Sequence, residues 1–254
     1  MITEIPLPQD IPEIGVYLVD KPVGPSSFRM VQLVRRAIGI KKTGHAGTLD
    51  PFASGLLVIC AGRPATKLIS SLMGGPKEYE ATVSLGVETD TQDTEGRVTA
   101  TRPVEQFSRE TIETCLAGFV GEIAQTPPLY SALKHGGKPL YYYARKGIEI
   151  ERQPRPVVIY GLECIDLGPT WFTIRVRCGK GTYIRTLAAD LGTALGCGAH
   201  LNSLRRTRSG FFSVDEAVAG EALSDVPSAR AVLLSQRRSV EEVLMKINSS
   251  SAKV

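Results

Sequence analysis

Apolar residues recur at two different spacings along this chain. Five segments have the short apolar runs or the alternation of apolar and polar positions that predict β-strands: residues 16–19, 56–60, 79–85, 157–165 and 171–178. The segment at 56–60 is apolar throughout, which predicts a buried strand.

Three further segments have helical spacing. A helix is predicted at residues 26–38, with Ser26 or Ser27 as its N-cap. Arg35 and Arg36 lie near its C-terminal end, where the helix dipole favours cations. The other two apolar stripes are Ile112, Leu116, Phe119 and Val120 after a cap at Ser108, and Leu187, Leu191 and Leu195. Strands and helices follow one another in mixed order. The predicted fold class is therefore α+β, with a mixed, largely antiparallel central sheet flanked by helices.

One long segment, residues 125–156, fits neither spacing. It combines prolines and glycines with four tyrosines and many Lys and Arg residues. Long loops in compact domains are usually functional, and aromatic residues between cations suit stacking on bases and pairing with phosphates. We therefore predict a basic RNA-binding loop here, with a short helix near residues 140–146.

Charge is distributed unevenly along the chain, although the net charge of the 254 residues is only +4. Residues 78–122 hold ten acidic and three basic side chains, whereas residues 130–185 hold ten basic and four acidic ones. Residues 201–212 add three arginines and no acid. A positive end of the fold favours a polyphosphate partner.

The sequence also bears on the cellular compartment. The longest apolar run is about seven residues, against the roughly 18 that a membrane span needs, and the proline-rich start lacks the basic region of a signal peptide. Five cysteines without CxxC spacing predict reduced thiols. We therefore expect a cytoplasmic protein without a membrane partner.

The strongest candidate for chemistry is Asp50, at the end of the loop 44–51. Gly44 and Gly47 allow the backbone to approach a ligand closely, and Pro51 restricts Asp50 to extended conformations. Lys41, Lys42 and His45 lie just upstream, so the carboxylate has a basic entrance. An isolated Asp-Pro pair is usually only a turn, but this setting suits an acidic catalyst that acts on an anionic polymer.

Several other chemistries are not supported by the sequence. The three histidines and the scattered cysteines lack the spacing of metal ligands. Residues 178–182 lack the full P-loop frame, and no GxGxxG follows a predicted strand. We therefore expect a mechanism without cofactor or metal.

The combination of motifs is more specific than any one of them. The sequence resembles the TruB family of pseudouridine synthases, which isomerise uridine 55 in the T-loop of tRNA. The resemblance runs from about residue 16 to residue 212 and is carried, in order, by residues 20–22, 44–51, 77–79, 86–91, 127–134, 179–187, 196–201 and 204–207. It implies the pseudouridine synthase fold, tRNA as the substrate, and no obligate protein partner.

The resemblance also implies a role for Asp50. Pseudouridine formation breaks the C1′–N1 bond, turns the base and joins C1′ to C5. Breaking a glycosidic bond builds positive charge at C1′, which a nearby carboxylate stabilises or traps. The aspartate that matches Asp50 does this work in the family. Attack on the sugar, attack on the base and removal of a sugar proton all remain open.

Four residues that follow Asp50 in the sequence are implied to contact the target base or the carboxylate. Tyr79 matches a tyrosine that stacks on the flipped base and is a candidate to accept the C5 proton. Arg185 matches an arginine that pairs with the catalytic carboxylate, which keeps such a group ionised and oriented. Tyr183 matches a second aromatic residue of the site, and Leu204 matches a residue that packs near the uracil.

Two residues that precede Asp50 in the sequence complete the implied site. His45 matches a histidine that lies against the T-loop where the flipped base was. Lys21, which precedes Pro22, either supports the catalytic loop or acts directly. By itself each of these side chains has an ordinary structural explanation, such as a core aromatic residue or a surface arginine.

The predicted organisation is a catalytic domain at residues 1–212, including the RNA-binding loop 125–156, and a short extension at 213–254. Bacterial members usually carry a PUA-type RNA-binding module after the catalytic domain, and residues 218–254 do not match one, although a helix is expected near 240–247. Two alternative functions make different demands on the sequence. A guide-RNA-dependent synthase needs a full PUA domain, and a non-catalytic RNA-folding helper does not need Asp50, Tyr79 and Arg185 together.

Overall fold

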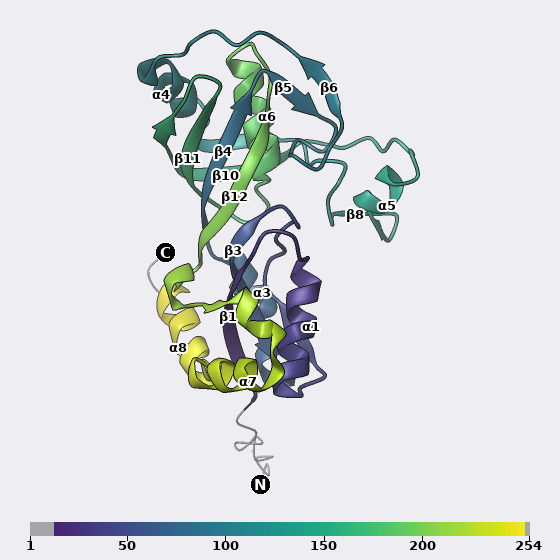
Figure 1. Cartoon of the computed structure of the whole chain (residues 1–254), viewed down its shortest axis with the longest axis vertical. Helices are drawn as coiled ribbons and strands as arrows, with labels where there is room; N and C mark the ends of the chain where they lie inside the picture. The colour runs from purple at the N-terminus through teal and green to yellow at the C-terminus, as the bar shows by residue number, and fades with distance from the viewer. Residues whose placement is uncertain (1–12, 252–254) are drawn as a thin grey trace. The chain divides into compact units, whose positions relative to one another are not determined.

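The structure is a computed structural model that describes residues 13–251. The chain forms two compact units, which we call unit 1 (Met1–Gly75 and Arg208–Val254) and unit 2 (Pro76–Thr207). Figure 1 shows the chain and labels most of the larger elements of each unit. Unit 2 is therefore an insertion within unit 1 in the order of the sequence.

Unit 1 is built from both ends of the chain. Its first part contains β1 (Gly15–Lys21), α1 (Ser27–Ile38), β2 (Thr43–His45), β3 (Ser54–Ala61), α2 (Arg63–Thr66) and α3 (Ile69–Gly74). Its second part contains β13 (Phe212–Ser213), η1 (Val214–Glu216), β14 (Val218–Ala219), η2 (Gly220–Ser224), α7 (Val226–Ser235) and α8 (Val240–Ser251). Strand β14 pairs in parallel with β1, and β1 and β2 both pair antiparallel with β3.

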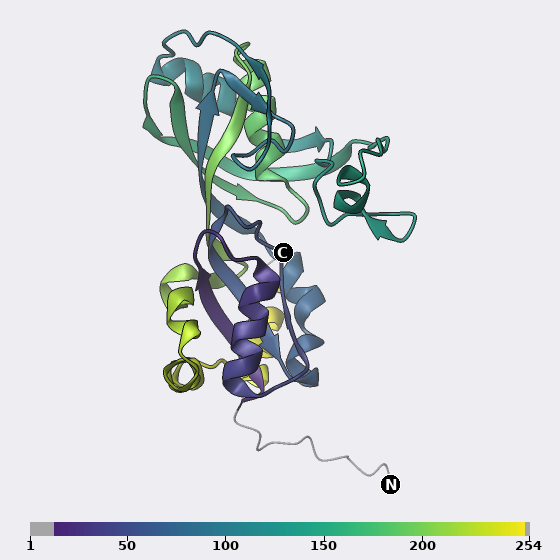
Figure 2. The same ribbon diagram turned by 45° about the vertical axis from the view of Figure 1, so that its right-hand side comes forward.

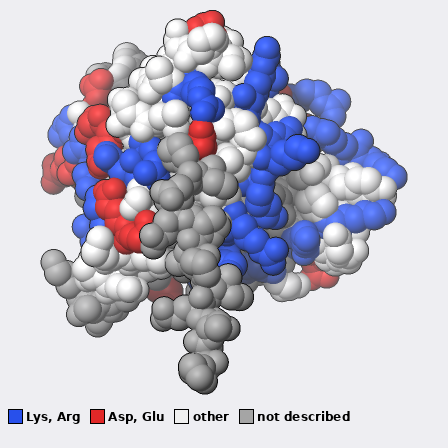
Figure 3. Space-filling model, turned by 90° about the horizontal axis from the view of Figure 1, so that it is seen from below, with Lys and Arg blue, Asp and Glu red and all other residues white. Residues whose placement is uncertain are grey.

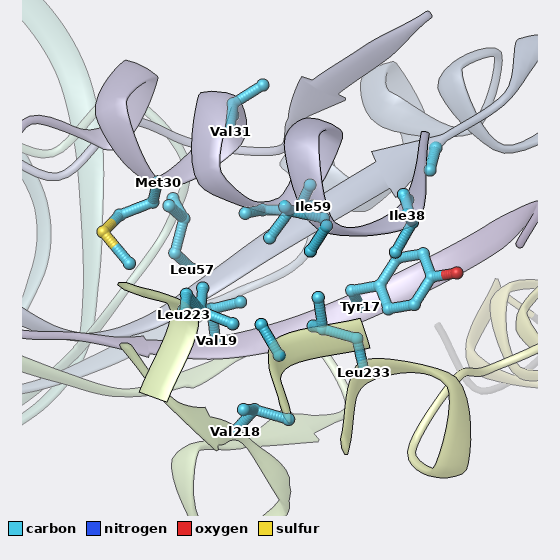
Figure 4. Packing of buried hydrophobic residues seen from close by; sticks show 14 residues of the cluster. Tyr17, Val19, Met30, Val31, Ile38, Leu57, Ile59, Val218, Leu223 and Leu233 are labelled. Carbon is cyan, nitrogen blue, oxygen red and sulfur yellow. The ribbon is translucent and has the colours of Figure 1, made fainter. Parts of the chain in front are cut away.

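Strands β1 and β3 are buried on both faces, which explains their nearly continuous apolar sequences. Tyr17 and Val19 point into one apolar cluster, together with residues of α1, η2 and α7 (Figure 4). Val16 and Leu18 point into a second cluster, with residues of α2, the start of α3 and α8. The prediction of a buried strand at 56–60 is thus confirmed, and Figure 2 shows α1 and β3 from a second side.

The helix predicted at 26–38 is also confirmed, and it is closed at both ends. The side chain of Ser26 accepts a hydrogen bond from the backbone nitrogen of Arg29 at 3.2 Å. Gly39 ends the helix with a φ of 76°, a conformation that glycine adopts without strain. One face of α1 is buried and the other is exposed.

Unit 2 contains the remaining strands and helices. They are β4 (Lys77–Leu85), β5 (Val87–Thr89), β6 (Val98–Thr101), α4 (Arg109–Ala117), β7 (Gly121–Gln125), β8 (Lys134–His135), β9 (Lys138–Pro139), α5 (Leu140–Ala144), β10 (Arg155–Leu167), β11 (Trp171–Cys178), α6 (Ile184–Ala194) and β12 (Ala199–Ser209). The order in its sheet is β12-β4-β11-β10-β7, in which β4 pairs antiparallel with β11, β11 with β10, and β10 with β7. The α+β class and the largely antiparallel sheet are as predicted.

One predicted helix is shorter than expected. The helix capped by Ser108 ends at Ala117, so Phe119 and Val120 do not belong to its apolar stripe, and Val120 is 47% exposed. After Gly118 the backbone bonds run from residue i to residue i−3, which tightens the chain into a turn before β7. Within residues 13–251, no helix has both the length and the apolar character that crossing a bilayer requires.

Candidate active site

Asp50 lies in the loop between β2 and β3 of unit 1, and its neighbour Leu49 is held by α1. The hydroxyl of Ser27, the first residue of α1, donates to the carbonyl oxygen of Leu49 and accepts from its amide nitrogen, each at 2.8 Å. Ser27 and Leu49 are both buried, whereas Asp50 is half-buried. Gly47, with a φ of 94°, makes the turn that precedes this contact.

Pro51, the residue after Asp50, is held by Lys21 at the end of β1. The fully buried ammonium of Lys21 donates to the carbonyl oxygens of Pro22 and Pro25, both at 2.8 Å, and to that of Pro51 at 3.3 Å. The backbone nitrogen of Gly24 also donates to Pro51, at 2.8 Å. Both neighbours of Asp50 are therefore fixed by buried groups, which restricts the orientations open to its carboxylate.

His45 lies on the same loop, at the end of β2. Its Nε2 lies 3.1 Å from the hydroxyl of Thr48, and its backbone pairs with Ile59 of β3. The ring is half-exposed. The structure thus brings three of the predicted residues, Lys21, His45 and Asp50, to one loop system in unit 1.

Arg185, in the first turn of α6, lies in unit 2 and is almost fully buried. Its guanidinium donates to Asp93 Oδ2 at 3.2 Å and to the carbonyl oxygens of Thr91 and Tyr130 at 3.0 and 2.8 Å. Asp93 is buried too, and its other carboxylate oxygen accepts from the hydroxyl of Thr91 and from the backbone nitrogen of Glu95. Arg185 is therefore locked in one conformation.

The sequence analysis missed Asp93 as a functional residue. Its partner Arg185 lies 92 positions further along the chain. No local spacing reveals such a pair. The expected pairing of Arg185 with Asp50 would join the two units and stays a prediction.

Tyr183 precedes α6 and is held through its backbone. Its amide nitrogen donates to Gln125 Oε1 at 2.8 Å, and its carbonyl oxygen accepts from Gln125 Nε2 at 3.0 Å. Gln125 is buried at the end of β7, so this amide fixes the start of α6. Gln125 was not predicted from the sequence either.

Tyr79 and Leu204 lie on neighbouring strands of unit 2. Tyr79 is half-buried on β4, opposite Val176 of β11, and Leu204 is 8% exposed on β12. The same two strands carry Lys77 and Arg206, both buried. Burial lowers the pKa of Lys77 to about 8, and the positive charge of Arg206 is the second cause of this shift.

The loop 125–156 has the composition and the short helix that were predicted. It forms the β8–β9 hairpin and α5, in which Tyr141 is exposed and Tyr142 is half-buried. The ammonium groups of Lys138 and Lys146 each lie 4.5 Å from the centre of the Tyr142 ring. Their hydrogen bonds to its hydroxyl lower the pKa of Tyr142. Exposed rings beside cations are the features that single-stranded nucleic acid recognises.

The five cysteines are all free thiols, as expected. Burial raises the pKa of each, to about 12 for Cys60 and about 11 for Cys178. A protonated, buried thiol is a poor nucleophile. Among residues 13–251, no group of three or more His, Cys, Asp or Glu side chains is placed to hold a metal ion.

Comparison with known proteins decides the family. A family model described as "TruB family pseudouridylate synthase (N terminal domain)" matches residues 35–184. This chain belongs to the TruB family of pseudouridylate synthases. A second model, described as "tRNA pseudouridylate synthase B C-terminal domain", matches residues 185–246. The predicted family and enzyme class are therefore confirmed.

TruB relatives match over most of the chain. A protein named tRNA pseudouridine synthase B from Desulfotalea psychrophila is 61% identical over 210 residues, which are 80% of this chain and 85% of the relative. One of the same name from Aromatoleum aromaticum is 54% identical over 218 residues, 86% of this chain and 70% of the relative.

A solved structure, "Crystal Structure of a Cbf5-Nop10-Gar1 Complex", matches with a TM-score of 0.69 at 27% identity. The match covers 92% of this chain and 63% of the chain in that complex. Together with the family match, this confirms the pseudouridine synthase fold. The roles of the seven predicted site residues are not tested by these matches and stay predictions.

Proposed function

We propose that this chain isomerises uridine to pseudouridine at position 55 in the T-loop of tRNA, without a cofactor and with Asp50 as the catalytic carboxylate. The family membership and the names of the relatives support the reaction class and tRNA as the substrate. The observation that carries the role of Asp50 is the double clamp on its neighbours, Leu49 and Pro51.

The chemistry makes use of such a clamp. Positive charge develops at C1′ when the glycosidic bond breaks, and a carboxylate stabilises that charge only if it is already in place. A loop that Ser27 and Lys21 already hold in place needs little rearrangement when the glycosidic bond breaks. Lys21 acts in this proposal as a support, because the contacts described above are to backbone carbonyls.

Unit 2 supplies the groups for the base. Tyr79 stacks on the flipped uracil and accepts the C5 proton, Tyr183 and Leu204 line the base, and Arg185 pairs with Asp50 to keep it ionised. The rigid hold on Arg185 by Asp93 supports a positioning role, since a surface arginine does not require a buried partner. His45 fills the space that the flipped base leaves in the T-loop.

The loop 125–156 is the proposed RNA contact outside the reaction centre. Tyr142 with Lys138 and Lys146 presents a ring and two cations on an exposed hairpin and helix. These groups suit the unpaired bases and phosphates of an RNA loop.

The test uses the purified protein alone with a T-arm transcript, scored for pseudouridine. Wild type and Asp166→Asn, which alters an exposed carboxylate on β10, should both form pseudouridine, and Asp50→Asn should form none. A requirement for added guide RNA or partner proteins would identify a guide-dependent synthase. RNA folding activity without any pseudouridine would identify a non-catalytic helper.

A further inference from the structure

The outer face of α1 and the turn after it form an open pocket in unit 1 that none of the roles above uses. Its volume is about 490 Å³, and its lining residues are Arg29, Gln32, Leu33, Arg35, Arg36, Gly39 and Lys41. Four of these seven residues are cations, and none is acidic. In the sequence, residues 21–49 contain six Lys and Arg residues and no Asp or Glu.

Among the described residues, no carboxylate pairs with these four cations. Within residues 13–251, the side chains of Arg29, Arg35, Arg36 and Lys41 form no ion pair with any carboxylate. All four are exposed. In Figure 3, Lys and Arg side chains predominate on one side of the visible face, and Asp and Glu side chains gather on the other. Repulsion among unpaired cations is relieved when an anion binds.

Helix stability explains only part of this arrangement. Arg35 and Arg36 lie in the last turn of α1, where cations interact favourably with the helix dipole. Arg29 lies in the first turn, at the positive end of the dipole, and that turn contains no acidic residue. A cation there opposes the dipole, so Arg29 requires another explanation, which an anionic ligand provides.

Phe28 adds a second feature that points to nucleic acid. This aromatic side chain is 60% exposed in the first turn of α1, next to Arg29. Exposed aromatic rings beside cations bind nucleic acid through combined ring contacts and phosphate pairing. A free inorganic anion would make no use of the ring.

The place of α1 in unit 1 identifies the RNA segment. Ser27 begins α1 and holds Leu49, so the helix starts at the Asp50 loop. Arg36 lies seven residues after Arg29, which corresponds to roughly 10 Å along the helix axis. An RNA whose target base is at Asp50 therefore has its adjoining strand along α1.

We propose that Phe28, Arg29, Arg36 and Lys41 bind the sugar-phosphate backbone of the stem strand that adjoins the target loop. This site rests on the proposed function, since it takes the same RNA. It recognises phosphates and shape rather than sequence, and so extends the RNA contacts beyond the loop 125–156.

The test compares two double variants that lose the same charge. Arg29→Gln with Arg36→Gln alters the α1 face, and Arg97→Gln with Arg102→Gln removes two cations from the acidic β5–β6 region of unit 2. Dissociation constants are measured as a function of salt concentration for two T-arm hairpins, one with the full stem and one with a shortened stem. Melting temperatures confirm that both proteins are folded.

The α1 variant should bind the full-stem hairpin about tenfold or more weakly, with a salt slope smaller by roughly 0.7–0.9 for each lost phosphate contact. The shortened hairpin should bind the α1 variant and wild type with similar affinity, and the control variant should resemble wild type with both RNAs. An unchanged affinity and slope for the full stem would overturn the proposal, as would an equal loss for both hairpins. Failure of the proposed function is distinguishable, because wild type itself would then form no pseudouridine.

Discussion

The hydroxyl of Ser27 and the backbone of Leu49 form a closed pair of hydrogen bonds, both 2.8 Å long. A single side-chain oxygen thereby satisfies both polar groups of a buried peptide residue. This contact joins the first residue of α1 to the residue before Asp50, across 22 positions of sequence. The start of α1 and the Asp50 loop are consequently positioned together.

Ser27→Ala should slow the reaction more than it weakens RNA binding. The substitution leaves the amide and the carbonyl of Leu49 buried without this partner, which costs about 1–3 kcal/mol of unfolding free energy. It also frees the Asp50 loop, and a displacement of about 1 Å can lower a rate about a hundredfold. The measurements are the single-turnover rate at saturating RNA, the dissociation constant and the melting temperature.

The matched control for that experiment is Ser26→Ala, one residue earlier. Ser26 caps α1 by accepting from Arg29 and does not hold the loop, so its loss should cost about 1 kcal/mol of stability and little rate. Equal rates in the two alanine variants would show that the Ser27 contact is merely structural.

The buried Arg185–Asp93 pair should be sensitive to removal of either member. Asp93→Leu leaves the guanidinium, 6% exposed, without its carboxylate and should lower the unfolding free energy by about 3–5 kcal/mol. The comparison is Glu88→Gln, which breaks the largely exposed Arg102 pair and should cost less than about 1 kcal/mol.

A double variant separates stability from activity at the Arg185–Asp93 pair. Asp93→Leu with Arg185→Met removes both charges and should regain much of the lost stability while pseudouridine formation remains low. Recovery of activity along with stability would argue that Arg185 has no role beyond packing. Urea unfolding and pseudouridine assays on the same preparations provide both readings.

Two substitutions at Tyr79 distinguish ring stacking from proton transfer. Tyr79→Phe keeps the ring, so RNA affinity should stay close to that of wild type while the rate falls. Tyr79→Leu loses the ring as well and should weaken both affinity and rate, by about 1–3 kcal/mol for the stacking contribution. If both variants turn over as fast as wild type, Tyr79 is only a residue of the strand.

Asp190 on α6 should make stability depend on pH. Burial raises its pKa from 3.8 to about 6 in the folded protein. The folded state therefore holds more protons than the unfolded chain between these two values, and this contribution to stability is lost as the pH rises through about 6. Asp190→Asn should stabilise the protein at neutral pH by about 1–2 kcal/mol, a value reduced from the full shift because the group is partly exposed.

The measurement for Asp190 is urea unfolding of wild type and Asp190→Asn at neutral pH and near pH 4. The difference between the two proteins should become much smaller at the lower pH, where the carboxyl is protonated in the folded protein and only partly ionised in the unfolded chain. A constant difference across the range would mean that the titration of Asp190 does not contribute.

The sequence predicts the fold well where the structure of a segment depends on nearby residues alone. The cap at Ser26, the apolar run at 56–60 and the alternation at 79–85 each depend on nearby residues, and all three predictions are confirmed. The predicted end of α4 was wrong, because apolar residues continue beyond Gly118 whereas the helix ends at Ala117. The spacing of apolar residues does not show where a turn ends a helix.

The candidate site was predictable only in its motif residues. Asp50 is recognisable from its glycine-flanked loop, but Ser27 and Gln125 act through contacts 22 and 58 positions away. Their functions depend on the packing of α1, β7 and α6, which no local pattern encodes. For the same reason, the sequence does not reveal Asp93 as the partner of Arg185.

The last prediction concerns the segment after residue 212, which belongs to unit 1 and contributes to its core. Val218 pairs with Val19 of β1, and Leu233 of α7 is fully buried in the same apolar cluster as α1. Leu233→Ala should therefore lower the unfolding free energy by about 2–5 kcal/mol. Leu244→Ala on α8 makes the same chemical change at a side chain that is 40% exposed, and should cost less than about 1 kcal/mol.

RNA assays on these two variants decide what the segment does. If it serves the core, Leu233→Ala should retain the wild-type ratio of kcat/KM between whole tRNA and the isolated T stem-loop, measured well below its melting temperature. Deletion of residues 218–254 should then abolish folding rather than change that ratio. A preference for whole tRNA of more than about tenfold, equivalent to about 1.4 kcal/mol, that disappears in a variant which remains folded would show instead that the segment binds RNA. The burial of Leu233 beside α1 argues for the core, because a surface that binds RNA has no need of a fully buried leucine.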